Sequence, residues 1–124
     1  MRHFVTALRA AALSIACLCL LAAPALAQSY VYRSDLTLRV GQSIMVYGAG
    51  SPNCARNQAP DWDAVARRLP RTDLGYFSNG GVVQLASSRC GGRIAGRGIV
   101  FTATRAGRAV LNLQGDRVTV TVRN

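Results

Sequence analysis

Apolar and polar residues alternate along several segments of this 124-residue chain. Successive side chains of a β-strand point to opposite faces, so alternation predicts strands with one buried face. Five segments show this pattern, namely 36–40, 44–47, 99–104, 109–113 and 118–122. Many of their positions hold β-branched residues, which pack well on a pleated, half-buried surface. In the second segment we expect Ile44 and Val46 to face inward and Tyr47, like Met45, to face outward.

The middle of the chain follows a different pattern. Four apolar residues lie at positions i, i+3, i+4 and i+7, which form one face of a helix: Trp62, Val65, Ala66 and Leu69. Asp61 is placed to cap the start of this helix, and Pro70 is placed to end it. Two helical turns are not stable alone in water, so we expect this apolar face to pack on the strands.

Turn-forming residues separate the other elements. The residues Asn79, Gly80 and Gly81 predict a tight turn before a strand over 82–86, and 87–92 predict a second loop. Together the patterns predict about six or seven short strands and no internal repeat. We therefore expect one all-β domain over residues 28–124, a small antiparallel β-sandwich with one short helix in the middle.

The first 27 residues have the pattern of a cleavable signal peptide. A basic start precedes an uncharged apolar run over 10–23, and Ala25-Leu26-Ala27 forms a small-residue cleavage site. The alternatives are a transmembrane anchor and a lipid-anchored cysteine at Cys17. A span needs about 20 apolar residues, whereas this run is shorter and Pro24 interrupts it. The pattern looks bacterial and predicts a periplasmic or extracellular protein with no membrane span after cleavage.

Removal of residues 1–27 simplifies the available chemistry. Residues 28–124 contain no histidine, lysine or glutamate, and their two cysteines are Cys54 and Cys90. In an exported protein this pair predicts a disulfide, which should stabilise the fold by roughly 3–4 kcal/mol in the chain-entropy model. The alternatives are a free thiol pair and an intermolecular bridge. Histidine-based triads are impossible in this segment, and two cysteines without histidine make a poor zinc site. We therefore expect no enzyme activity, no metal and no cofactor.

The same segment is strongly basic, with 13 arginines against five aspartates and a net charge of +8. Such a charge attracts polyanions, although it can also serve only solubility, and a GC-rich genome would replace lysine by arginine without functional cause. Arginine and glycine gather between residues 89 and 98. Backbone N–H groups in a glycine-rich loop can form an anion site with arginine as a clamp. The candidate anion-binding residues are Arg89, Gly91, Gly92, Arg93 and Arg97; the alternative is a solvated turn.

A second group of basic residues lies near aromatic residues. Such a mixture can bind single-stranded nucleic acid or glycans. The candidate partner surface comprises Arg67, Arg68, Arg71 and Tyr76. Trp62 belongs to the apolar face of the predicted helix, so it is expected in the core rather than on this surface.

The C-terminal residues resemble a known family. Phe101-Thr102-Ala103, then Gly107, Ala109 and Leu111, and finally 118–122 look like the last three strands of bacterial immunoglobulin-like domains. Residues 36–43 are similar to the opening strand pair of those domains. The resemblance implies an immunoglobulin-like β-sandwich with an adhesive, structural or ligand-presenting role and no catalytic residues. The helix and the cysteine pair depart from the family pattern.

A second resemblance is to small secreted cysteine-protease inhibitors of the chagasin type. Their Asn-Pro-Thr-Thr-Gly loop corresponds here to residues 48–54, which lack Thr-Thr-Gly, so the inhibitory role is not carried over.

The sequence therefore predicts a non-catalytic secreted or periplasmic binding or structural module. The alternatives are a polyanion-binding protein that uses the arginine–glycine loop and an inhibitor of a secreted enzyme. The expected partner is a protein or a polyanion, with nucleic acid ranked below these.

Overall fold

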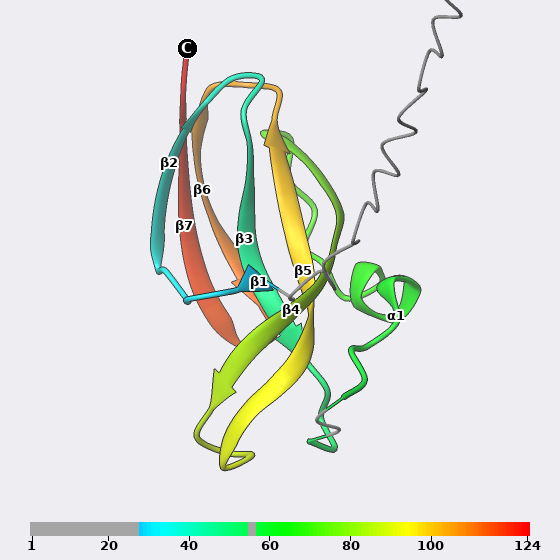
Figure 1. Cartoon of the computed structure of the whole chain (residues 1–124). Coiled ribbons are helices and arrows are strands. Elements are labelled where there is room, and N and C mark those ends of the chain that lie inside the picture. Colours follow the sequence, from blue (N-terminus) through cyan, green and yellow to red (C-terminus); the bar gives the residue numbers. More distant parts are fainter. Residues whose placement is uncertain (1–27, 55–56) are drawn as a thin grey trace, which may run out of the picture.

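A computed structural model describes residues 28–54 and 57–124 (Figure 1). The predicted signal peptide over 1–27, including Cys17, lies outside the described residues. None of the helices in the described part is long and apolar enough to cross a membrane.

Strands make up most of the described structure, in two sheets. The elements in chain order are β1 (Gln28–Ser29), β2 (Asp35–Arg39), β3 (Ser43–Gly50), α1 (Trp62–Ala66), β4 (Gly75–Ser87), β5 (Gly92–Ala103), β6 (Gly107–Leu113) and β7 (Asp116–Arg123). One sheet has the strand order β1-β4-β5-β3 and the other has the order β2-β7-β6. The expected all-β class with one short central helix is confirmed.

The strand directions differ in part from the expected antiparallel arrangement. The pairs β3–β5, β4–β5 and β6–β7 are antiparallel, as expected for strands joined by short connections. The pairs β1–β4 and β2–β7 are parallel. Each parallel pair joins an early strand to one that follows much later in the chain. Alternation along a strand reveals its buried face but not the direction of its neighbour, so the sequence pattern could not show this.

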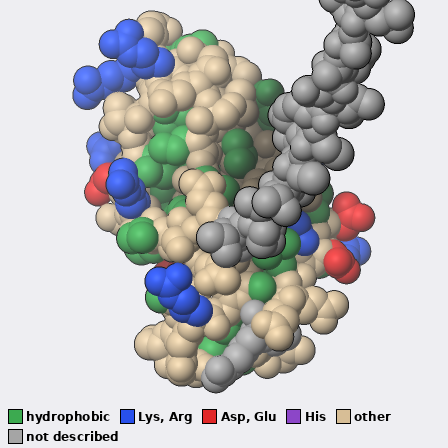
Figure 2. Space-filling model, in the orientation of Figure 1, with side chains coloured by type: hydrophobic (Ala, Val, Ile, Leu, Met, Phe, Trp, Pro, Cys, Tyr) green, Lys and Arg blue, Asp and Glu red, His purple; other side chains and the backbone are tan. Residues whose placement is uncertain are grey.

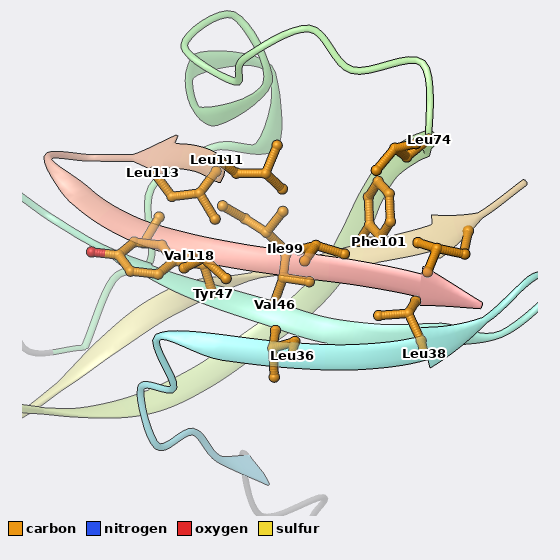
Figure 3. Packing of buried hydrophobic residues seen from close by; sticks show 14 of the residues in the cluster. Leu36, Leu38, Val46, Tyr47, Leu74, Ile99, Phe101, Leu111, Leu113 and Val118 are labelled. Atoms are coloured by element: carbon orange, nitrogen blue, oxygen red, sulfur yellow. The ribbon is translucent and has the colours of Figure 1, made fainter. Parts of the chain in front are cut away.

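Both sheets contribute to one hydrophobic core (Figure 3). The buried side chains of β2, β5, β6 and β7 include most of the inward rows that alternation predicts: Leu36, Leu38, Ile99, Phe101, Ala103, Leu111, Leu113, Val118, Val120 and Val122. Val40, which the pattern placed in the same row as Leu36 and Leu38, follows the end of β2 and is exposed. Phe101 is completely buried, and its ring centroid lies 5.4 Å from that of Phe77. The core therefore joins residues from both ends of the chain.

The predicted alternation over 44–47 is wrong at Tyr47. The pairing of β3 with β5 shifts between Met45 and Tyr47, which places Val46 in a bulge. A bulge adds one residue to a strand and changes which way the following side chains point. As a result, Val46 and Tyr47 are both buried, with Tyr47 only 8% exposed.

The predicted turn at residues 79–81 is also wrong, because β4 runs through it from Gly75 to Ser87. The register of β4 against β5 shifts between Asn79 and Val82, so the two glycines lie in a bulge. Gly81 has a φ of +80°, a backbone conformation that glycine adopts without strain. Its N–H donates to the Asn79 side-chain oxygen at 2.9 Å, which supports the bulge locally.

Helix α1 packs as predicted. Val65 is buried, and the partly buried Trp62 and Leu69 pack on the core. Asp61 occupies the N-cap position, but its side chain makes no capping hydrogen bond. Regular helix ends at Ala66. Leu69 follows in a turn, and its N–H donates to the Ala66 carbonyl oxygen at 3.2 Å.

The predicted disulfide is present. Cys54 and Cys90 are bonded, with their Cα atoms 5.5 Å apart. The bond links the segment that follows β3 to the turn between β4 and β5. In Figure 1 the β4–β5 hairpin extends beyond the neighbouring strands, so the disulfide ties a projecting element to the rest of the domain.

Candidate functional site

The arginines of the predicted anion site do not converge on one loop. Gly91 lies in the β4–β5 turn, whereas Gly92 begins β5, and Arg93 and Arg97 lie along that strand. The segment expected as a loop up to residue 98 is therefore strand from Gly92 onward.

Each of these guanidinium groups already has a partner within the protein. Arg89 Nη2 donates to the carbonyl oxygens of Pro52 at 3.0 Å and Ser51 at 3.4 Å. Arg97 Nε donates to the carbonyl oxygen of Pro60 at 2.9 Å. Arg93 Nη1 makes a longer contact of 3.5 Å with Ser29 Oγ. Arg89 and Arg97 thus hold the segment after β3 against the sheet that contains β4 and β5.

The residues of the predicted partner surface are all exposed, but they do not line one common hollow. Arg71 and Tyr76 line a hollow of about 450 Å³ between α1 and β4. Arg68 lines another hollow together with Arg89. On the face shown in Figure 2, basic side chains are scattered rather than gathered into one patch.

The structure brings together a site that the sequence analysis did not single out. A pocket of about 500 Å³ lies between the end of β3, the β4–β5 hairpin and the β6–β7 turn. We call it the tyrosine pocket. Its lining combines aromatic, aliphatic and polar side chains, including Tyr30, Tyr32, Tyr47, Leu85, Ile94, Ser87, Ser88, Arg89, Gln114 and Asp116. Pockets of this size and mixed lining are typical of small-molecule sites.

The three tyrosine rings pack edge to face. The Tyr47 centroid lies 6.4 Å from that of Tyr30 and 6.2 Å from that of Tyr32, at interplanar angles of 66° and 90°. These distances and angles are favourable for aromatic pairs. The rings therefore support one another before any ligand enters.

The tyrosine hydroxyl groups are all held by the protein. Tyr30 donates to the Val46 carbonyl at 2.8 Å, and Tyr32 donates to the Arg117 carbonyl at 2.6 Å. The Tyr47 hydroxyl donates to the Asp116 carboxylate. Fixed hydroxyl groups fix the ring orientations, so the pocket is preformed.

Burial also affects the ionisation of Tyr30 and Tyr47. Burial raises the pKa of Tyr47 well above its ordinary value, and the hydrogen bond to Asp116 raises it further. Burial raises the pKa of Tyr30 as well. Both phenols therefore remain neutral at physiological pH, and Tyr47 acts as a donor to Asp116.

Glycines in β3 and β5 make room for the aliphatic side of the pocket. Gly48 pairs with Gly98, and Gly50 pairs with Gly96. A Cβ atom at Gly48 would lie 2.4 Å from Leu85 Cδ2 and 3.1 Å from Tyr30 Cδ1. Leu85 and Tyr30 can thus lie directly over the backbone only because glycine occupies this position.

The sequence carried partial signals for this pocket. Tyr30 and Tyr32 flank a single valine, and Tyr47 precedes a Gly-Ala-Gly segment. These signals are far apart in the chain, and Asp116 has a sufficient explanation as a turn residue. Only the meeting of β3 with the β6–β7 turn shows that Tyr47 and Asp116 belong together.

In the described part of the chain, no group of three or more metal-ligating side chains comes together. In comparisons with known proteins, no family model, curated protein or solved structure matches this chain.

Proposed function

We propose that this protein is a non-catalytic binding module of the periplasm or the extracellular space, with the tyrosine pocket as its binding site. The observation that carries the proposal is the preformed cluster of Tyr30, Tyr32 and Tyr47, whose rings and hydroxyl groups are held in place by the protein. A preorganised site loses little conformational entropy when a ligand binds. The signal-peptide pattern of residues 1–27 supports export.

The chemistry of the pocket favours binding over catalysis. Residues 28–124 contain no histidine, lysine or glutamate to serve as a general base near neutral pH. The Tyr47 phenol donates to Asp116 and has a raised pKa, so it is a poor nucleophile at neutral pH. The pocket is lined by tyrosine rings and a few polar groups, which suit recognition.

We further propose that the domain is an immunoglobulin-like β-sandwich. Support comes from the two sheets that share one core and from the alternating C-terminal strands that resemble that family. In such a domain, ligand sites lie on loops and edges that the sheets hold in place. The tyrosine pocket, at the β6–β7 turn and the β4–β5 hairpin, has this kind of location.

The proposal is tested by amide NMR of residues 28–124 with the disulfide intact. A library of sugars, amphiphiles and short peptides at millimolar concentration should contain members that shift the amide signals of Gly48 and Gly50. Tyr32→Ala should weaken this binding, whereas Tyr76→Ala should not, because Tyr76 is exposed outside the pocket. Equal effects of the two substitutions, or a library without any shift at these glycines, would contradict the proposal.

A further inference from the structure

The tyrosine pocket continues into a second hollow. This hollow, of about 630 Å³, is lined by side chains that include Arg68, Arg89, Asn112 and Gln114, and we call it the arginine hollow. Gly50, Arg89 and Gln114 line both the pocket and the hollow, so the two adjoin. A ligand larger than one ring can therefore occupy both.

The arginine hollow carries positive charge that the protein does not neutralise. The ion pair within the described residues joins Arg105 to Asp73, so neither Arg68 nor Arg89 is paired with a carboxylate there. Arg89 donates to two uncharged carbonyl oxygens, which fix its position but leave its charge. It also precedes the disulfide-bonded Cys90. Positioned arginines of this kind bind carboxylates and phosphates strongly.

The opposite end of the combined site is different in character. One carboxylate oxygen of Asp116 accepts a hydrogen bond from the Tyr47 hydroxyl group, and Asp116 is exposed at the rim of the pocket. Its second oxygen can accept a hydrogen bond from a ligand hydroxyl group. The site therefore presents an acceptor and tyrosine rings in the tyrosine pocket, Arg89 where the pocket and the hollow adjoin, and Arg68 in the hollow.

We infer that the tyrosine pocket and the arginine hollow together bind an acidic saccharide, a short sugar chain whose rings carry carboxylates. This inference rests on the proposed binding function. A sugar ring offers an apolar C–H face for a tyrosine ring and hydroxyl groups for Asp116 and the nearby serines. The carboxylate of the next ring meets Arg68 and Arg89, where it can form charge-assisted hydrogen bonds.

Other anionic ligands fit this arrangement less well. An alkyl chain would bury Asp116 and the serines of the pocket against hydrocarbon, which is costly for polar groups without partners. A nucleic acid carries a phosphate on every nucleotide but offers few hydroxyl groups to Asp116, whereas each ring of an acidic sugar chain keeps free hydroxyl groups beside its carboxylate. An acidic sugar chain can turn hydroxyl groups toward Asp116 and its carboxylate toward the arginines.

The test is a calorimetric titration of residues 28–124 with a short oligogalacturonate. The fully methyl-esterified oligomer keeps the rings but lacks the charge, and inorganic phosphate supplies charge without a ring. An oligothymidylate supplies phosphates and stacking bases. We expect the acidic oligomer to bind about tenfold more tightly than its ester, a ratio that corresponds to one charge-assisted contact.

Substitutions locate the two halves of the site. Arg68→Gln should weaken the acidic oligomer about tenfold and leave the ester nearly unchanged. Arg108→Gln removes the same charge from an exposed position of β6 outside both hollows and should have little effect. Tyr32→Ala should weaken the acidic oligomer and the ester alike.

The outcomes separate the inference from the proposed function. If the ester or a neutral sugar binds as tightly as the acid, the pocket binds a ligand but the acidic saccharide is wrong. If phosphate alone or the oligothymidylate binds more tightly than the acidic oligomer, the inference is wrong in favour of an anion site or a nucleic-acid site. If none of these probes binds but a member of the library shifts the amide signals of Gly48 and Gly50, only the inference is wrong; if neither the probes nor the library shift these signals, the proposed function fails as well.

Discussion

Replacement of Gly96 by alanine tests whether Leu85, in the wall of the tyrosine pocket, can pack over β5 only where that strand has glycine. A Cβ atom at this position would lie 2.4 Å from Leu85 Cδ1, 2.8 Å from Leu85 Cγ and 3.0 Å from the Ala49 carbonyl oxygen. Carbon atoms in contact prefer about 3.5–4.0 Å, so Leu85 has to move by about 1 Å or more. Because Leu85 is only partly buried, it can move toward the tyrosine pocket.

The expected magnitude is the difference of two effects. Crowding of a packed site costs about 1–3 kcal/mol. Alanine also restricts the unfolded chain relative to glycine, which contributes about 0.4–1 kcal/mol of stability. We therefore expect Gly96→Ala to lower the free energy of unfolding by about 0.5–2 kcal/mol. Gly50→Ala is the control, because its nearest contact is the end of the Ile94 side chain at 3.0 Å, and it should cost less.

A double-mutant cycle in urea, with the disulfide intact, isolates the contact. Leu85→Ala removes the two closest atoms that a Cβ at position 96 would meet and leaves only the Ala49 carbonyl oxygen at 3.0 Å, so Gly96→Ala should cost less in that background. The two substitutions should thus couple favourably by about 1 kcal/mol. An equal cost of Gly96→Ala in both backgrounds would show that Leu85 does not require the glycine.

Three further predictions follow from the remaining interactions. Replacement of both Cys54 and Cys90 by serine should lower the free energy of unfolding in urea by about 3–4 kcal/mol, and a loss below about 1 kcal/mol would contradict a stabilising role. Burial raises the pKa of Tyr47 above its ordinary value of 10.0. The contribution of Tyr47 to the free energy of unfolding is therefore fully present below pH 10 and decreases as the pH rises above 10. Unfolding curves measured at alkaline pH should show this decrease, and Tyr47→Phe should reduce the slope of the free energy of unfolding against pH. An unchanged slope would argue against the raised pKa. Arg97→Ala removes the hydrogen bond to the Pro60 carbonyl, so it should cost about 0.5–1.5 kcal/mol and speed amide exchange in residues 57–61, whereas unchanged exchange would contradict its role as a tether.

The fold was largely predictable where the alternation was regular. The inward rows of β2 and β7 are buried as expected, because each strand has one face against the core and one toward solvent. The helical face of Trp62 and Val65 was predictable for the same kind of reason. The predictions failed at Tyr47 and at Gly80, where the strands contain bulges. A bulge depends on how two strands pair, so the sequence of either strand alone gives only a weak signal for it.

The candidate site was much less predictable than the fold. The sequence indicated an arginine–glycine loop, but Arg89 and Arg97 donate to backbone carbonyls of the segment after β3. The carbonyl oxygens within reach decide how a guanidinium is held and which hollow, as at Arg89, it can still line. That information is absent from local sequence.

The sequence by itself determined the strand class, the helical face and the cysteine pair, because these depend on periodicity and on the two cysteines within residues 28–124. The tertiary structure decided the parallel pairing of the early strands, the burial of Tyr47 and the union of three tyrosines with Asp116. The physical reason is the distance along the chain between the residues that interact. Periodicity records how one strand divides its side chains between core and solvent, whereas a pocket forms where strands and turns from distant parts of the chain come into contact.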